Sequence, residues 1–119
     1  MVKVISLVGI IMFVLTGCGP ETIFVRPELD TPQQHVFNGN RFLEQEKWED
    51  ALREFDRAIY LDPDCIEALV GLAITHGKYG DVQKGFDLLE TARLRASGEE
   101  DLGRIQNAYE KLNRIDPRP

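Results

Sequence analysis

The sequence predicts an all-α fold, and three observations support this prediction. From residue 31 onward, apolar residues recur at intervals of three and four, which is the period of a helix rather than of a strand. Glycine, proline and short polar residues divide the same region into segments of helical length. Finally, residues 32–65 and 66–99 are two consecutive stretches of 34 residues that align without a gap. A repeat of this length is typical of stacked helix pairs.

The amino-terminal segment has the composition of an export signal. Lys3 supplies positive charge, and residues 4–15 form an apolar core, which is shorter than the roughly 20 residues that a membrane-spanning helix needs. The segment ends on four residues: Leu15, Thr16, Gly17 and Cys18. They resemble the lipobox of bacterial lipoproteins, which implies that residues 1–17 are a signal peptide and that Cys18 carries lipid. The alternatives are an uncleaved signal anchor and an ordinary signal peptide with a chance cysteine.

The lipoprotein resemblance also implies a location. Acyl chains (palmitate) on Cys18 would hold the mature chain on a membrane, because two or more chains give stable anchoring. Gly19 rather than an aspartate follows the cysteine. By the sorting rule of enteric relatives, this favours the outer membrane, facing the periplasm.

Residues 18–31 are predicted to be a lipidated tether, because they contain two prolines and show no helical period. The apolar triplet Ile23-Phe24-Val25 is unusual for a solvated linker. We therefore expect this part of the tether to dock on the domain, either on its surface or in its groove.

The charge of the chain excludes some partners. The net charge is −6, and no basic stripe is visible in the sequence. Such a chain is not expected to bind nucleic acid. It is also not expected to adhere electrostatically to anionic lipid, so the acyl chains on Cys18 would provide the membrane attachment.

The helical region contains consistent start and stop signals. Thr31 with Gln34 has the spacing of a capping box, and Pro32 occupies the first helical position, where its missing N–H has no effect. Similar signals recur: Asp64 with Glu67, Asp81 after Gly80, Ser97 with Glu100, and the endings Asp62-Pro63 and Asp116-Pro117. Together these signals predict five helices, at about residues 32–45, 48–61, 65–79, 82–96 and 98–115.

The first 34-residue unit has small and large residues at regular places: Gly39, Phe42, Ala51, Phe55, Ala58 and Pro63. These resemble the size-restricted positions of the tetratricopeptide repeat. The resemblance implies that residues 32–65 fold as a helix-turn-helix pair, in which Gly39 and Ala51 let the two helices cross closely. His35 and Asn38 stand where the family has tryptophan and leucine.

The second unit, residues 66–99, matches the family less well. The matching residues are Leu72, Ala73, Leu89 and Ala92, whereas His76, Gly85 and Ser97 replace an aromatic residue, an alanine and a proline. A glycine inside a helix is less favourable than alanine by about 1 kcal/mol. We therefore expect the second unit to be the less stable.

Residues 98–115 do not complete a third repeat. Leu102, Ile105, Tyr109 and Leu112 form one apolar stripe at helical spacing, and Lys111 and Arg114 belong to the opposite, polar face. The segment resembles the solvating helix that caps such arrays. The predicted fold is thus a short α-solenoid of two tetratricopeptide repeats plus a C-terminal capping helix.

No pattern in the sequence is typical of an active site. His35 and His76 are the only histidines and are far apart, and no metal-ligand spacing or glycine-rich phosphate loop occurs. With Cys18 carrying lipid, Cys65 has no intrachain disulfide partner and is expected to be a small buried residue. We predict that the protein is not an enzyme and needs no cofactor or metal.

The family resemblance instead implies recognition by the first helix of each pair. The residues expected to bind a partner are Val36, Asn40, Leu43, Glu44, Val70, Ile74 and Lys78. Some repeat proteins of this family bind a terminal carboxylate, but Val36 and Gly71 occupy two of the positions that do so, and no clamp of that kind is expected. A partly apolar surface suits an amphipathic helix or an extended segment of a partner protein.

The expected function is that of a membrane-anchored periplasmic adaptor. It would bind a protein partner in envelope assembly, secretion or a pilus-type system. The alternatives are a structural lipoprotein that self-associates without a separate ligand, as a homo-oligomer, and a groove that is filled by the tether of the same chain.

Overall fold

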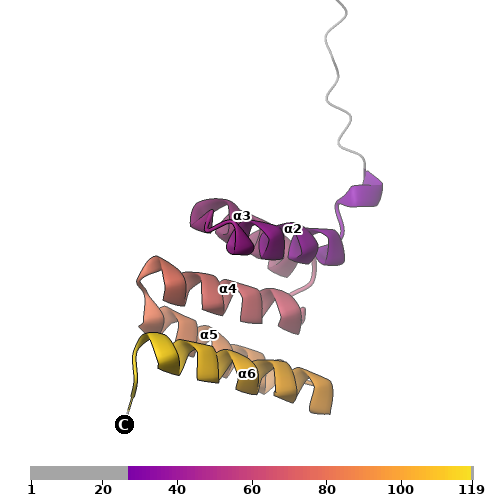
Figure 1. The fold of residues 1–119 in the computed structure, drawn as a ribbon. Helices are drawn as coiled ribbons and strands as arrows, with labels where there is room; N and C mark the ends of the chain where they lie inside the picture. Colours follow the sequence, from indigo (N-terminus) through magenta and orange to yellow (C-terminus); the bar gives the residue numbers. More distant parts are fainter. Residues whose placement is uncertain (1–26, 119) are drawn as a thin grey trace, which may run out of the picture.

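The computed structural model describes residues 27–118, and this part of the chain is helical without any strand (Figure 1). A 3-10 turn comes first, followed by five α-helices: η1 (Pro27–Leu29), α2 (Pro32–Glu44), α3 (Trp48–Leu61), α4 (Ile66–Tyr79), α5 (Val82–Arg95) and α6 (Glu99–Ile115). The predicted all-α class and the five helices are confirmed. Every predicted boundary lies at the observed residue or next to it.

The helices form two layers. α2 and α3 pack as one antiparallel pair, and α4 and α5 pack as another. α4 contacts both helices of the first pair, and α6 contacts both helices of the second. As a result, α2, α4 and α6 run side by side in one layer, with α3 and α5 in the other (Figure 1).

Most of the predicted helix ends are confirmed. The Thr31 hydroxyl oxygen accepts a hydrogen bond from the Gln34 backbone N–H at 3.2 Å, and the Asp81 carboxylate accepts one from the Lys84 N–H at 3.0 Å. Gly80 ends α4 in the left-handed conformation, with φ of 113°, which glycine adopts without a steric penalty. Asp62 and Asp116 are the C-caps before their prolines.

Two predicted caps are wrong. Cys65, not Asp64, is the N-cap of α4, and the Asp64 N–H instead donates to the Asp62 carboxylate at 3.0 Å in a local turn. Gly98, not Ser97, is the N-cap of α6. Ser97 does not cap α6 but is hydrogen-bonded to it, because its backbone N–H donates to the carboxylate of Asp101, a residue of α6, at 3.1 Å.

The first core cluster is centred on Phe55, whose side chain has no exposed surface. Its ring lies between α2 and α4. A Cβ atom added to Gly39 would lie 2.7 Å from the ring, and one added to Gly71 would lie 2.4 Å from it. Both glycines therefore provide the space that the ring occupies.

The buried positions of the first pair recur 34 residues later. The pairs are Gly39 with Ala73, Ala51 with Gly85, Phe55 with Leu89, and Ala58 with Ala92, and all eight residues are buried. Each pair thus contributes the same four positions to the core.

α4 is the central helix, with nine buried residues, and α6 closes the core beyond it. Ile105, Ala108 and Leu112 are the buried residues of α6. The predicted apolar stripe is wrong at Leu102, which is 48% exposed. Ala108, which was not part of the stripe, is buried instead, together with Ile105 and Leu112.

Gly85 has a role in helix packing that cannot be inferred from its low helix propensity. A Cβ atom there would lie 2.8 Å from the backbone oxygen of Ala73 and 2.9 Å from Cδ1 of Leu112. The glycine therefore permits the close approach of α5 to α4 and α6. Helix propensity alone therefore does not describe Gly85, and the lower stability of the second unit stays a prediction.

We expect Gly85→Ala to lower the free energy of unfolding and Gly103→Ala to raise it. In α6, a Cβ atom on Gly103 would meet nothing within 4 Å, so alanine should add its helix propensity of about 1 kcal/mol. At Gly85 the same gain is outweighed by overpacking, which typically destabilises by about 1–3 kcal/mol. Urea denaturation of the two variants followed by circular dichroism measures both changes. Equal shifts in the same direction would contradict the packing role of Gly85.

The residues that precede α2 are attached to the first helix pair through His35. Its Nδ1 atom lies 2.7 Å from a carboxylate oxygen of Glu54, and its Nε2 atom lies 2.9 Å from one of Asp30. Arg57 of α3 forms an ion pair with the same Asp30. Arg57, followed by His35, lowers the pKa of Asp30 from 3.8 to about 2.

The geometry around His35 favours its protonated form. Burial lowers the pKa of His35, but the hydrogen bonds and charges of Glu54 and Asp30 outweigh burial and raise the pKa above its ordinary value of 6.5. A neutral imidazole has one N–H and can donate to one carboxylate, whereas the imidazolium donates to both.

We expect the stabilising contribution of His35 to be pH-dependent. Because its pKa is raised on folding, the contribution is complete below pH 6.5 and is lost as the pH rises through the folded-state value. The difference in free energy of unfolding between the wild type and His35→Gln should therefore shrink with increasing pH.

His76→Gln provides the control for this experiment. Burial, and then the charge of Lys84, lowers the pKa of His76. The stabilising contribution of neutral His76 is therefore present above pH 6.5 and is lost as the pH decreases below it, because the unfolded chain is protonated first. A His35→Gln difference that is constant across neutral pH would contradict the charged bridge.

Candidate functional site

A groove opens on the layer formed by α2, α4 and α6. It has a volume of about 540 Å³. Its lining residues are Asn40, Leu43, Glu44, Ile74, Lys78, Lys111, Arg114 and Ile115. We refer to these eight residues as the groove.

The three helices bring these side chains together because they run in the same direction. Each contributes residues from its C-terminal half, at spacings of three and four that place them on one face. On α4, for example, Ile74 and Lys78 are one turn apart. The groove is thus a property of stacked helices and not of a single loop.

The structure brings together five of the seven residues that were expected to bind a partner. Asn40, Leu43, Glu44, Ile74 and Lys78 all line the groove. Of these, Ile74 is 8% exposed, whereas Asn40, Glu44 and Lys78 are exposed.

The other two expected residues lie elsewhere. Val36 is 7% exposed, belongs to the first core cluster and does not line the groove. Val70 lines an adjoining hollow of about 360 Å³, together with Ile74, Gly103, Arg104, Asn107 and Lys111. Ile74 and Lys111 line both hollows, so the two adjoin in a depression between α4 and α6.

Three groove residues were not expected from the sequence. Lys111, Arg114 and Ile115 all come from α6. The sequence predicts a solvent-exposed polar face for this helix, which does not follow the 34-residue pattern. The one signal in the sequence for a binding role of α6 is the presence of cationic residues on that face.

The charges along the depression differ from one end to the other. Arg104 Nη2 lies 2.7 Å from Glu67 and 2.8 Å from Glu100, and Arg104 Nη1 lies 3.7 Å from Asp101. In contrast, none of Lys78, Lys111 and Arg114 forms an ion pair with another described residue. The groove end therefore has three cationic side chains and one carboxylate, Glu44.

The remaining candidate residues are not part of the groove. His76 is half-buried, and its pKa is lowered by burial. Cys65 is a half-buried free thiol packed against the first core cluster, and burial raises its pKa. Among residues 27–118, no three histidine, cysteine, aspartate or glutamate side chains are grouped so that they could hold a metal ion.

The predicted lipidation residue, Cys18, and the signal peptide at residues 1–17 lie outside the described residues. Within the described helices, none has both the length and the apolar character that crossing a membrane requires. Comparisons of the chain with family models, curated proteins and solved structures find no match.

Proposed function

We propose that this protein is a membrane-anchored periplasmic adaptor, built from two tetratricopeptide repeats and a capping helix, and that it binds a protein partner in the groove. The partner would belong to an envelope assembly, secretion or pilus-type system. The lipobox-like residues before Cys18 support the anchor, and the acidic composition supports attachment through lipid rather than through charge.

The repeated packing supports the tetratricopeptide assignment. α4 packs on α2 and α3 as α6 packs on α4 and α5, and the same four positions are buried in both pairs. Arrays of this kind expose their first helices as a shared binding surface.

One observation carries the proposal of partner binding. Five residues at the repeat positions that are predicted to bind a partner line a single groove, on the first helix of each pair. The groove combines apolar and polar side chains, as do surfaces that bind a helix or an extended segment.

Site-specific crosslinking tests the proposal. A photoreactive amino acid would replace Asn40, in the groove, or Leu94, which is 77% exposed on α5. In cells of the native host, we expect the variant at residue 40 to crosslink one dominant protein and the variant at residue 94 not to. Equal crosslinking at both positions would contradict groove binding.

Membrane fractionation of the same cells tests the anchor. We expect the wild type in the outer membrane and a Cys18→Ala variant outside it. Identical fractionation of the two forms would contradict the lipoprotein assignment.

A second function, self-association, is favoured by one specific residue. Phe37 is 57% exposed and stands 34 positions before Gly71, the residue through which α4 approaches the preceding pair. By this repeat relation, Phe37 lies on the face of α2 against which a preceding helix pair would stack. Sedimentation of the full chain in a non-ionic detergent, with Phe37→Asp as the control, distinguishes this function. A dimer that Phe37→Asp dissociates would support it.

A further inference from the structure

We infer that the groove binds an acidic, extended segment of the partner, with Lys78, Lys111 and Arg114 contacting its carboxylates and an apolar side chain resting on Ile74. This inference rests on the proposed function, because it specifies the chemistry of the segment that the groove accepts.

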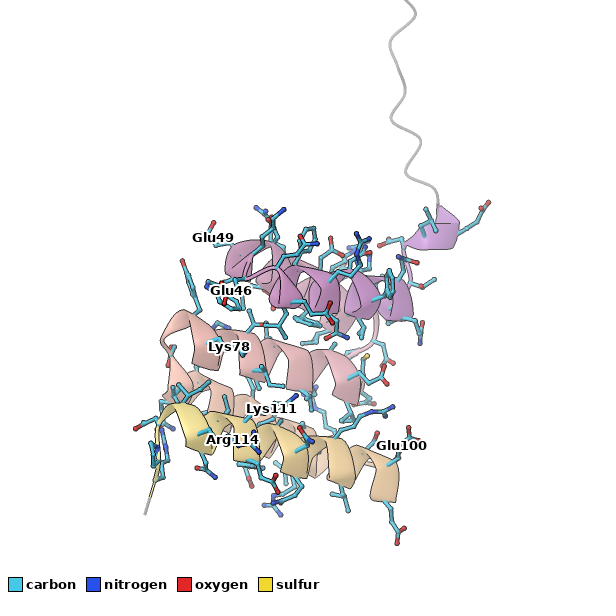
Figure 2. All side chains as sticks on the ribbon, viewed as in Figure 1. Glu46, Glu49, Lys78, Glu100, Lys111 and Arg114 are labelled. Carbon is cyan, nitrogen blue, oxygen red and sulfur yellow. The ribbon has the colours of Figure 1, made fainter. Side chains whose placement is uncertain are left out.

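The charge distribution is the first argument. The chain contains 20 acidic and 14 basic residues, yet three basic side chains converge on one groove. Figure 2 shows Lys78 on α4 and Lys111 and Arg114 on the adjacent α6, with Glu100 at the opposite end of α6. Clustered cations repel one another, so a ligand carboxylate between them stabilises the arrangement.

The contrast with Arg104 is the second argument. The chain provides Arg104 with three carboxylates of its own, from Glu67, Glu100 and Asp101. Further along α6, no carboxylate forms a described ion pair with Lys111 or Arg114. Within residues 27–118, the carboxylates therefore leave these two cations available to a ligand.

The apolar lining defines the rest of the segment. Leu43, Ile74 and Ile115 line the groove beside the cations, and Val70 lines the adjoining hollow. From Val70 to Lys78, α4 rises about 12 Å, at about 1.5 Å per residue. An extended chain covers this length with about four residues, at about 3.3 Å each. A short motif with acidic residues next to an apolar residue fits this surface.

The remaining polar groups restrict how the segment lies. Glu44 is the one carboxylate of the groove and comes from α2, so it repels acidic side chains from that wall. The acidic residues of the ligand are thereby directed to α4 and α6. Asn40, also on α2, offers amide groups that suit the backbone of an extended peptide.

A peptide segment is favoured over an anionic lipid headgroup. The chain as a whole carries a net charge of −6, which opposes approach of the domain to an anionic bilayer. A short peptide reaches the groove without bringing the whole acidic surface against a charged membrane.

A peptide selection tests the inference. The probe is a bead library of random hexapeptides, acetylated and amidated so that only side chains carry charge, with full-length protein in a non-ionic detergent as the target. We expect enrichment of aspartate and glutamate next to leucine, isoleucine or valine. Replacing the carboxylates of a selected peptide by amides should weaken binding about tenfold or more, as expected for charge-assisted hydrogen bonds.

Matched variants connect the selection to the groove. Lys111→Gln combined with Arg114→Gln should abolish the preference for the acidic over the amide peptide. Lys84→Gln removes an exposed lysine of α5 outside the groove and should leave the preference unchanged. Circular dichroism verifies that all variants remain folded.

Three results would overturn the inference. They are a selection without acidic enrichment, an acidic preference that survives the double variant, and binding to phosphatidylglycerol vesicles that the double variant abolishes while peptide binding is not detected. The proposed function is tested separately. If the partner still crosslinks at residue 40 after Lys111→Gln and Arg114→Gln, the adaptor function stands and only the acidic ligand is wrong.

Discussion

Replacing Phe55 by alanine is expected to lower the free energy of unfolding by about 3–5 kcal/mol, the range for a fully buried aromatic residue. The ring has no exposed surface and fills the space between α2 and α4, so its removal leaves a cavity at the junction of the two helix pairs. A loss of this size is a large part of the total stability of a small domain, which is about 5–15 kcal/mol. Urea denaturation followed by circular dichroism measures it.

Tyr60→Ala is the matched control for this prediction. Tyr60 is an aromatic residue of the same helix, but it is 76% exposed, so its removal should change the stability by less than about 1 kcal/mol. If both variants lose the same stability, the difference in burial between the two rings is not what determines it.

A double-mutant cycle tests the contact between Phe55 and Gly71. Gly71→Ala alone should destabilise the fold, because the added Cβ atom would lie 2.4 Å from the ring. In the Phe55→Ala background, the same substitution fills part of the cavity and should have a much smaller effect. Additive effects would show that the ring does not occupy the space beside Gly71.

The helices were predictable from the sequence because their signals are local. Thr31, Gly80 and Asp81 act within one turn of their own positions, and the structure confirms them. The end of α2 has no such signal. In the turn after α2, Glu46 adopts the left-handed conformation, with φ of 59°. A glycine at this position would have indicated the helix end in the sequence.

Features that depend on tertiary packing were harder to predict. The role of Gly85 follows from the carbonyl of Ala73 and a methyl group of Leu112, which no local pattern reports. His35 acquires its two carboxylate partners from Asp30 and Glu54, and Glu54 is 19 residues away in the chain. In the sequence, this histidine is visible only as a departure from the repeat pattern.

The candidate site shows the same division. Repeat positions identified the contributions of α2 and α4 to the groove, including Asn40 and Lys78, because those two helices follow the 34-residue pattern. They did not identify Lys111 and Arg114, because α6 departs from that pattern. The wall that carries most of the positive charge therefore follows only from the packing of α6 against α4 and α5.

Leu112→Ala is expected to lower the free energy of unfolding by about 2–5 kcal/mol. Leu112 is fully buried, and its methyl groups occupy the space left by two glycines. A Cβ atom on Gly77 would lie 2.3 Å from Cδ2, and one on Gly85 would lie 2.9 Å from Cδ1. The side chain thus fixes α6 to both α4 and α5, and urea denaturation measures its contribution.

Leu102→Ala distinguishes this role from general hydrophobicity. Leu102 lies on the same helix but is 48% exposed, so its truncation should have an effect of less than about 1 kcal/mol. Because α6 also carries Lys111 and Arg114, loosening it should weaken the groove before the whole domain unfolds. In Leu112→Ala, hydrogen exchange should therefore accelerate in α6 more than in α2 and α3. Uniform acceleration in all helices would instead mean that α6 does not unfold separately from the other helices.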